Sequence, residues 1–350
     1  MTPRGTDWGL ALLVLAGLAT GLGTWFAGSP GAAWVFDAHA IGGTALAVVV
    51  VVKLRRVWPR LRARPADAWR GVAALACVAL VLGTGLAWSS AGRFGLAGYT
   101  ALVWHGALGA VLGAAVFAHA RRRAIRPRAR DLAGRRQFLA VAVLGAGAVA
   151  ARQLQRPAER ALGLPGARRR FTGSYDAGSF TGNAFPITSW VADRPRPAAP
   201  GADRLRVAGR VRRPLELTPA QLDRGDALVA TLDCTGGFYS TQRWRGVSLG
   251  RLLDEAGLAP GARHVRVISR TGYRWSFALP DARTLLLATH VGDEPLTHGH
   301  GAPCRLVAPG RRGFQWIKWV ERIEVHHDPD PAAPASTVWS SFTAEGRGDA

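Results

Sequence analysis

The stretch Leu232-Asp233-Cys234-Thr235-Gly236-Gly237-Phe238-Tyr239 places a single cysteine between an apolar run and a pair of glycines. It continues into Trp244-Arg245-Gly246-Val247-Ser248-Leu249 and Leu252-Leu253, which has the apolar spacing of a helix start. The apolar run predicts a strand ending near Cys234, and the glycines predict a turn. We therefore expect the thiol at a loop mouth, where metal-ligating thiolates are usually presented. The alternative is a buried structural cysteine at a strand end.

The placement of the basic residues distinguishes a membrane protein from a nucleic-acid-binding protein. The 350 residues suffice for two or more domains, and the formal charge is +22 with a pI near 11.6. The basic residues gather in two clusters, 53–70 and 121–136, which flank long uncharged segments. That placement is typical of membrane topology, whereas a nucleic-acid-binding patch would interleave arginines with aromatic residues. We expect membrane lipid as a partner and no nucleic acid.

The three cysteines, Cys77, Cys234 and Cys304, do not make a disulfide framework. Cys77 lies inside an apolar segment. A bridge between Cys234 and Cys304 is chemically open to an exported domain, but it would consume the thiol expected to bind metal. We therefore expect neither of these two cysteines to be bridged.

Four apolar segments in the first part of the chain are long enough to cross a membrane, which takes about 20 residues. They cover residues 8–26, 34–57, 71–89 and 99–120. The second ends with Lys53 and Arg55, whose long side chains can reach the membrane interface. We assign residues 1–122 to an all-α transmembrane module of four helices.

The distribution of positive charge orients this module. The Arg/Lys-rich loops after the second and fourth helices, and hence the amino terminus, are expected in the cytoplasm. Arg135 and Arg136, followed by the apolar run 137–151, form a short fifth helix, a segment resembling a twin-arginine export signal, or both. Each alternative places the chain after about Arg152 on the extracytoplasmic side of the cytoplasmic (inner) membrane. The export signal would add the twin-arginine export machinery as a partner.

Two histidines are expected at membrane depth, where ionisable side chains are usually functional. His39 lies near the outer start of the second helix and His105 near the outer start of the fourth, so both imidazoles can reach one haem iron. The spacing from His105 to His119 resembles that of four-helix membrane cytochromes b. Lys53 stands where a second inner ligand would follow His39. We predict one haem b held by His39 and His105; the alternative is a haem-free membrane anchor.

The sequence after the membrane module changes to short β-like runs. Residues 123–170 hold the basic loop, the export-like segment or fifth helix, and a linker. One helix is predicted over residues 247–257, and strands are predicted over 204–211, 227–232, 264–269, 274–279, 284–290, 305–308 and 319–326. This mixture favours an α+β catalytic domain over residues 171–328, with a coiled, many-stranded sheet. The tail, residues 329–350, is expected to be irregular.

The cysteine segment resembles the molybdenum-cofactor domain of the sulfite oxidase family. In that family a lone loop cysteine, followed by a W-x-G-V-x-L-x-x-L-L string, supplies the protein sulfur to molybdenum, and this chain carries the string from Trp244 onward. The resemblance implies an α+β molybdopterin domain. It also implies molybdenum-molybdopterin as cofactor, with Cys234 as metal ligand and catalytic residue.

Other strings resemble the same family. The segment 180–186 is similar to one whose asparagine touches the pterin, with Gly182 where sulfite oxidases proper carry arginine, and the runs 300–310 and 313–319 resemble the periplasmic protein methionine sulfoxide reductase catalytic subunits. The phosphate tail of a pterin needs cationic donors and close backbone approach. Asn183 could instead be a turn residue, and Arg305 and Lys318 solvated sheet-edge charges. The resemblance implies cofactor contacts from Asn183, Ser269, His300, Arg305, the backbone of Trp316 and Ile317, and Lys318.

The combined pattern implies a membrane-anchored molybdopterin-dependent oxidoreductase. We expect oxo transfer on a small or peptide-borne S-oxide or N-oxide, with electrons exchanged through the membrane module and the quinone pool. One alternative is oxidation of sulfite or another sulfur compound, which Gly182 disfavours because a cation should help to hold a doubly charged oxyanion. Another is a haem-only membrane electron carrier or sensor with a non-catalytic exported domain.

Overall fold

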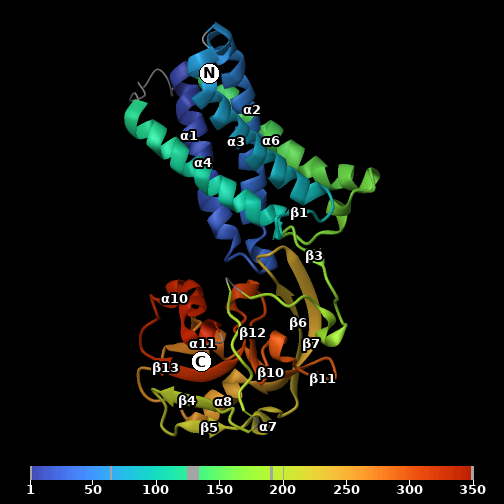
Figure 1. Ribbon diagram of the computed structural model, residues 1–350, viewed down its shortest axis with the longest axis vertical. Helices are drawn as coiled ribbons and strands as arrows, with labels where there is room; N and C mark the ends of the chain where they lie inside the picture. The colour runs from blue at the N-terminus through green and yellow to red at the C-terminus, as the bar shows by residue number, and fades with distance from the viewer. Residues whose placement is uncertain (1, 64, 124–133, 190–191, 200, 348–350) are drawn as a thin grey trace. The chain divides into compact units, whose positions relative to one another are not determined.

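The computed structural model describes residues 2–63, 65–123, 134–189, 192–199 and 201–347 (Figure 1). The chain divides into two compact units, Met1–Tyr175 and Asp176–Ala350. A short strand, β3 (Tyr175–Asp176), lies at the division. Part of the predicted basic loop, residues 124–133, falls outside the described residues.

The first unit is helical. Within its described residues, five helices are long and apolar enough to cross a membrane, judged by length and composition. They are drawn from blue to green in Figure 1 and are α1 (Pro3–Thr24), α2 (Trp34–Ala63), α3 (Pro65–Ser90), α4 (Ala101–Arg123) and α6 (Arg135–Ala161). The remaining elements are η1 (Pro30–Ala32), η2 (Pro165–Arg168) and a hairpin of β1 (Gly95–Leu96) and β2 (Tyr99–Thr100). The fifth helix is therefore present and, at 27 residues, longer than predicted.

The helices of this unit share a small internal core and have an apolar exterior. Helix α1 packs on α2 and α4, while α3 packs on α4 and α6 on α2. Val14, Leu46 and Leu112 are buried between the helices. Many large apolar side chains instead point outward, among them Leu12, Leu86 and Phe117. An exterior of this kind is typical of a helix bundle surrounded by lipid.

The second unit is an α+β domain, as predicted, but its strands form two sheets. One sheet has β7 (Phe238–Ser248) between β6 (Asp226–Asp233) and β10 (Leu286–Val291), and β10 also pairs with β11 (Glu294–Pro295) and β12 (Arg305–Val307). The other has the order β5-β4-β13-β8-β9. Its strands are β4 (Leu205–Gly209), β5 (Leu215–Leu217), β8 (His264–Ser269), β9 (Arg274–Ala278) and β13 (Val320–His326), and only the β4–β13 pairing is parallel.

Short helices connect the strands and complete the core. They are η3 (Gly182–Ala184), α7 (Pro219–Leu222), α8 (Leu249–Ala256), α9 (Leu279–Ala282), η4 (His298–His300) and η5 (Gly313–Gln315). Helix α8 buries Leu249, Leu252, Leu253 and Ala256, the spacing of one helical face. These residues join a single hydrophobic core with Trp244, Leu306 and Ile323. The W-x-G-V-x-L-x-x-L-L string is therefore the segment that passes from the central strand into this core.

Strand β7 is the main feature that the sequence interpretation missed. The helix predicted from residue 247 begins only at Leu249. The preceding Phe238–Ser248 is a strand that pairs with β6 over residues 239–246 and with β10 over residues 244–248. Ser240 and Gln242 are buried on this strand, so its polar pattern does not alternate as a half-buried strand should. Their donors are satisfied by a segment distant in sequence, because both side chains donate to the carbonyl of Gly178, at 3.1 and 2.5 Å.

The prediction of an irregular tail is also wrong for the described residues. The tail forms α10 (Ala333–Trp339), η6 (Ser340–Phe342) and α11 (Ala344–Arg347). Ser340 and Ser341 donate hydrogen bonds to Oδ1 of the buried Asp193, at 2.9 and 2.5 Å, and Thr271 donates to Oδ2 at 2.7 Å. A proline- and alanine-rich composition concealed this order because the stabilising partner lies far away in the sequence.

The absence of a side chain at Gly246 allows β7 and β10 to lie close together. A Cβ at Gly246 would lie 2.0 Å from the carbonyl oxygen of Leu287. We expect Gly246→Ala to destabilise the second unit by about 3 kcal/mol or more and to lower its Tm by roughly 6–12 °C, measured by thermal unfolding of the full chain. The control is Gly272→Ala, where φ is +83° but a Cβ meets nothing within 4 Å, so only backbone strain of roughly 1–2 kcal/mol is expected. An equal or smaller effect at Gly246 would contradict this account.

Candidate functional site

Cys234 lies in the turn that joins β6 to β7. The pair Asp233 and Tyr239 closes the hairpin. Within the turn, the Cys234 N–H donates to the Phe238 carbonyl at 2.8 Å, and the Gly237 N–H donates to the Cys234 carbonyl at 3.0 Å. Gly237 has a φ of +99°, a left-handed conformation that favours glycine. The glycine-bearing turn predicted after the strand is therefore present, and it holds the thiol at the end of the hairpin.

The sulfur of Cys234 is partly exposed and lies among hydrogen-bond donors. The Gly236 N–H donates to Sγ at 3.3 Å, and the Thr188 hydroxyl lies 3.7 Å from it. Burial raises the pKa of the thiol, while these two donors and the Arg312 charge act in the opposite direction. The thiol therefore resists ionisation until a stronger cation is present, and a coordinated metal ion deprotonates a thiol outright.

A buried ion pair supports the turn from behind. Arg312 Nη1 lies 2.7 Å from Asp233 Oδ1, and their side chains are 4% and 2% exposed. Arg312 Nη2 also donates to the Cys234 carbonyl at 3.3 Å. A Cβ at the next residue, Gly313, would lie 3.0 Å from Cys234 Cα, so the two chain segments run in direct contact. The position of Cys234 therefore depends on the segment around Arg312.

A buried arginine and a half-buried lysine lie close to this turn. Arg305, on β12, is 2% exposed, and its guanidinium lies over the rings of Trp244 and Trp316 at 5.2 and 5.9 Å. Lys318 Nζ donates to the carbonyls of Thr188 and Gly299, both at 2.6 Å. Among the described residues, neither cation has a carboxylate within ion-pair distance. The alternative of solvated sheet-edge charges is therefore wrong for Arg305, and Lys318 lies outside the strands.

The electrostatics of these cations follow from burial. Burial lowers the pKa of Arg305 to about 9, so the guanidinium stays charged at neutral pH. Burial, followed by the charge of Arg305, lowers the pKa of Lys318 to about 7. Arg305 Nη1 donates to the His300 carbonyl at 3.1 Å, whereas Nε has no hydrogen-bond partner among the described residues. The pair therefore carries positive charge and donor capacity that the described protein groups do not satisfy.

His300 is fixed by both of its ring nitrogens. Its Nε2 lies 3.0 Å from the Phe185 carbonyl, which can only accept, so we assign the proton to Nε2. Nδ1 then accepts from the Thr297 hydroxyl at 2.8 Å. Burial, together with the charges of Arg305 and Lys318, lowers the pKa of His300 to about 4, although the Phe185 hydrogen bond opposes this. His300 is therefore neutral at pH 7.

Asn183 lies in η3 and contacts the same loop. Its Nδ2 donates to Glu294 Oε2 and to the Pro295 carbonyl, at 3.0 and 2.9 Å, and its Oδ1 accepts from the Thr297 N–H at 3.1 Å. Asn183 and His300 thus meet at Thr297. Residues 181–185 and 294–300 are held together by these bonds.

The other predicted contacts are placed differently. The Trp316 N–H donates to the Gly313 carbonyl at 3.1 Å, so this donor already has an acceptor, and the Trp316 ring lies against Arg305. Ile317 is buried, and its carbonyl accepts from the Leu306 N–H at 2.7 Å. Ser269 is also buried, but its hydroxyl contacts Thr271, at 3.3 Å, in the network of Asp193. The described hydrogen bonds of Ser269 thus do not connect it to Cys234, His300, Arg305 or Lys318.

We name the connected group Cys234, Thr188, His300, Arg305 and Lys318 the Cys234 cluster. Thr188 joins it through its hydroxyl to the sulfur and through its carbonyl to Lys318, and nothing in the sequence marked it. Asp233 and Arg312 were also missed. The available signal was a carboxylate directly before the cysteine and an arginine directly before the Gly313-Phe314 string.

The helical unit holds the second predicted metal site. The rings of His39 and His105 have centroids 5.8 Å apart. His39 Nδ1 lies 3.0 Å from the Thr20 hydroxyl, and His105 Nδ1 lies 2.9 Å from the Val81 carbonyl. A Cβ at Gly85 would lie 2.9 Å from His105 Cε1, so the ring occupies space that a glycine leaves. Lys53, at the position of a missing inner ligand, forms an ion pair with Asp7 at 2.7 Å.

Comparison with known proteins gives the class of the second unit. Residues 193–333 match the family model for the oxidoreductase molybdopterin binding domain. The protein-methionine-sulfoxide reductase catalytic subunit MsrP of Gluconobacter oxydans (strain 621H) is 29% identical over 47% of this chain and 56% of its own length. Sulfite oxidase of Gallus gallus is 31% identical over 47% of this chain and 42% of its own. Nitrate reductase [NAD(P)H] of Hordeum vulgare is 30% identical over 37% of this chain and 19% of its own.

These matches define a molybdopterin-binding oxidoreductase domain. The chain spans between 19% and 56% of the length of the three relatives. Among solved structures, the sulfane dehydrogenase SoxCD from Paracoccus pantotrophus is 27% identical over 38% of this chain and 40% of its own, with a TM-score of 0.37. Residues 193–333 therefore form a molybdopterin-binding oxidoreductase domain that is similar to those of sulfite oxidase and of the MsrP catalytic subunit.

The residues of the Cys234 cluster fit a molybdopterin. A thiolate is a suitable ligand for a soft metal centre. An anionic pterin phosphate suits the buried Arg305 and the half-buried Lys318, which have no carboxylate partner in the part of the chain that the structure describes. The unpartnered Arg305 Nε is the observation that most directly calls for a further acceptor.

The buried ion pair between Asp233 and Arg312 should contribute to the stability of the second unit. Replacing Arg312 with methionine removes the positive charge that pairs with the buried Asp233 carboxylate, which should cost about 3–5 kcal/mol and lower the Tm of the second unit by on the order of 10 °C. Thermal unfolding of the full chain measures it. The neighbouring Arg311 is the control, because its pair with Asp281 is exposed and Arg311→Met should cost less than about 1 kcal/mol. Equal shifts in the two variants would refute a special role for Arg312.

Proposed function

We propose that this chain is a membrane-anchored oxidoreductase that reduces a small or peptide-borne S-oxide or N-oxide, with electrons from the quinone pool. The observation that carries the proposal is the Cys234 cluster, which combines a half-buried cysteine with a buried arginine and a half-buried lysine that lack carboxylate partners among the described residues. A bound molybdopterin would supply the redox chemistry of oxo transfer.

The chain's residues have distinct roles in this proposal. Cys234 ligates the metal, and Arg305 and Lys318 bind the anionic part of the cofactor. His300 is neutral and fixed by both ring nitrogens, so it can present its ring to the pterin without adding charge. Asn183 fixes the loop that carries His300, and the Asp233–Arg312 pair holds the Cys234 turn in place. Three further residues remain proposed cofactor contacts, Ser269, Trp316 and Ile317. Their existing hydrogen bonds already use the Ser269 hydroxyl, the Trp316 N–H and the Ile317 carbonyl.

The surroundings of Gly182 favour reduction over sulfite oxidation. Gly182 has a φ of +60°, and a Cβ there would lie 3.1 Å from Glu294 Oε2. This position therefore faces a carboxylate, and a long cationic side chain would have to displace its neighbours. A site for the sulfite dianion is expected to present a cation. The first named relative is a methionine-sulfoxide reductase subunit, which agrees with this direction. Oxidation of sulfite or another sulfur compound is the second candidate.

The helical unit is proposed to bind one haem b through His39 and His105. The Thr20 hydroxyl donates to the Ala16 carbonyl at 2.6 Å, so toward His39 it acts as the acceptor. The Val81 carbonyl can likewise only accept from His105. Both imidazoles are therefore assigned a proton on Nδ1, which leaves the Nε2 lone pairs for a metal ion. The ring separation of 5.8 Å is short enough for both to reach one iron.

The five long apolar helices support an inner-membrane, multi-pass location. We propose the cytoplasmic side for the basic clusters and the extracytoplasmic side for the second unit, following the charge rule. Transport of the second unit would involve the twin-arginine machinery if Arg135 and Arg136 act as its signal. A haem-only electron carrier or sensor remains the alternative, and the metal content of the second unit decides between them.

Metal and pterin content test the catalytic half of the proposal. We expect near-stoichiometric molybdenum and pterin in the full chain purified after growth with molybdate. We also expect reduction of methionine sulfoxide by a reduced dye. Cys234→Ser should lose the thiolate-to-metal absorption and the activity, because it removes the metal-ligating sulfur.

The matched control is Cys304→Ser. Cys304 is fully buried, and its thiol donates to the Val320 carbonyl at 3.4 Å, so this variant should keep both metal and activity. A folded parent without molybdenum would refute the enzyme proposal. Turnover of sulfite but not of S-oxides or N-oxides would favour the second candidate.

Optical spectra test the haem proposal. His39→Leu and His105→Leu should each abolish the low-spin haem spectrum of the purified full chain, because both ligands serve one iron. His119→Leu is the control, since His119 has no assigned role, and it should leave the spectrum unchanged. Retention of the low-spin spectrum in either of the first two variants would contradict the ligand assignment.

A further inference from the structure

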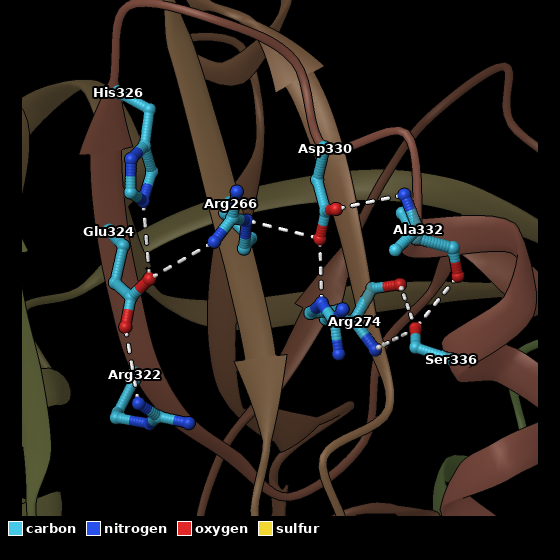
Figure 2. A network of polar contacts seen from close by, with 9 residues as sticks. Arg266, Arg274, Arg322, Glu324, His326, Asp330, Ala332 and Ser336 are labelled. Carbon is cyan, nitrogen blue, oxygen red and sulfur yellow. Dashed lines mark hydrogen bonds and ion pairs between the residues drawn. The ribbon is translucent and has the colours of Figure 1, made fainter.

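The solvent side of the sheet β5-β4-β13-β8-β9 carries arginines on three adjacent strands (Figure 2). Ile268 on β8 is paired directly with Arg322 on β13 and with Arg274 on β9. Arg266 lies two residues before Ile268 and therefore on the same face of β8. The register alone thus places three guanidinium groups around one apolar side chain.

These residues line a basin of about 190 Å³. Ile268 is 3% exposed because the arginine side chains cover it. Gly272, which has no side chain, leaves one end of the basin open. The lining residues are Arg266, Ile268, Gly272, Arg274, Arg322 and Glu324.

Glu324 is one of two carboxylates beside the basin, and both of its oxygens are engaged. Oε1 lies 3.1 Å from Arg322 Nη1. Oε2 lies 3.5 Å from Arg266 Nη1 and 3.2 Å from His326 Nε2. Figure 2 shows Glu324 between Arg322 and Arg266, so each of its oxygens already contacts an arginine.

Asp330 is the other carboxylate and is also fully used. Oδ2 lies 3.2 Å from Arg266 Nε and 2.6 Å from Arg274 Nε, and Oδ1 accepts from the Ala332 N–H at 3.0 Å. Burial acts to raise the pKa of Asp330, but the Arg274 and Ala332 hydrogen bonds and the arginine charges outweigh it and lower that pKa. Asp330 is therefore ionised at neutral pH and already paired.

The arginines keep donors that these two carboxylates do not use. Arg266 Nη2, both Nη atoms of Arg274, and Arg322 Nε and Nη2 have no hydrogen-bond partner in the part of the chain that the structure describes. The three side chains are 23%, 30% and 47% exposed, so they are held in place yet open to solvent. Three positive charges face two negative ones.

We propose that this basin binds an oxyanion of the phosphate or sulfate class. A guanidinium presents parallel N–H donors that match such an anion in a two-point contact, which a neutral or cationic ligand cannot exploit. The anion would balance the excess charge and satisfy the unused donors together. The site shares no residue with the Cys234 cluster, so it stands independently of the proposed function.

The test measures binding of inorganic phosphate and sulfate to the full chain in a neutral detergent. Isothermal titration at constant ionic strength, with chloride as the competing salt, gives the Kd. We expect binding in the parent chain and a Kd at least about tenfold weaker in Arg322→Gln, which removes one charge-assisted contact. Arg322 is the most exposed of the three arginines, so this variant should keep its fold, as its Tm will verify.

Arg251→Gln is the matched control. Arg251 is 50% exposed and pairs with one carboxylate, Asp226, at 3.2 Å, but it lies on α8 outside the basin. It should bind phosphate as the parent does. Failure of the parent to bind either anion, or equal weakening in both variants, would overturn the proposal. Arg322→Lys, which keeps the charge but loses the fork, should bind with intermediate affinity.

A further titration distinguishes a lipid head group from free inorganic phosphate as the source of the bound oxyanion. Glycerophosphoglycerol is the soluble head group of an anionic lipid and carries a phosphodiester, whereas inorganic phosphate carries more charge at neutral pH. Tighter binding of the diester, lost in Arg322→Gln, would identify a lipid head group. Tighter binding of inorganic phosphate, lost in the same variant, would identify a free anion.

Discussion

The second unit is organised around positive charge that its own carboxylates do not neutralise. Arg305 and Lys318 are held by backbone carbonyls and by the faces of two tryptophans, which stabilise a cation without cancelling its charge. Burying such charge is costly, and the cost persists in the folded chain until an anion arrives. The hairpin turn, the His300 loop and the Gly313 segment all pack around these two side chains. This arrangement is the one expected of a binding site for an anionic cofactor.

The two units were predictable from sequence to different degrees. Helices that must span a bilayer are specified by local composition, so the four spans and the further apolar run at 137–151 could be read from charge gaps. In the second unit the strands that alternate were also found. Strand β7 escaped because its buried positions include Ser240 and Gln242, whose partners come from a loop some sixty residues earlier. No local pattern reports such a partner.

The candidate site shows the same division. Cys234, Arg305 and Lys318 were found because a motif marked them. Thr188, Asp233 and Arg312 escaped because their roles depend on contacts between segments that are distant in sequence. The backbone contact expected from Trp316 stays a prediction, although its N–H closes a local turn. Burial also changed the meaning of Arg305, since sequence cannot distinguish an exposed arginine at a sheet edge from one stacked between rings.

The bonds from Ser340 and Ser341 to Asp193 join the two ends of the second unit. Asp193 stands near the beginning of that unit, and Oδ1 of its buried carboxylate lacks these two donors until Ser340 and Ser341 have been synthesised, 147 and 148 residues later. A ribosome still holding the two serines inside its exit tunnel would therefore leave Oδ1 without them. The unit reaches its final stability only once both serines have left the tunnel and reached Asp193.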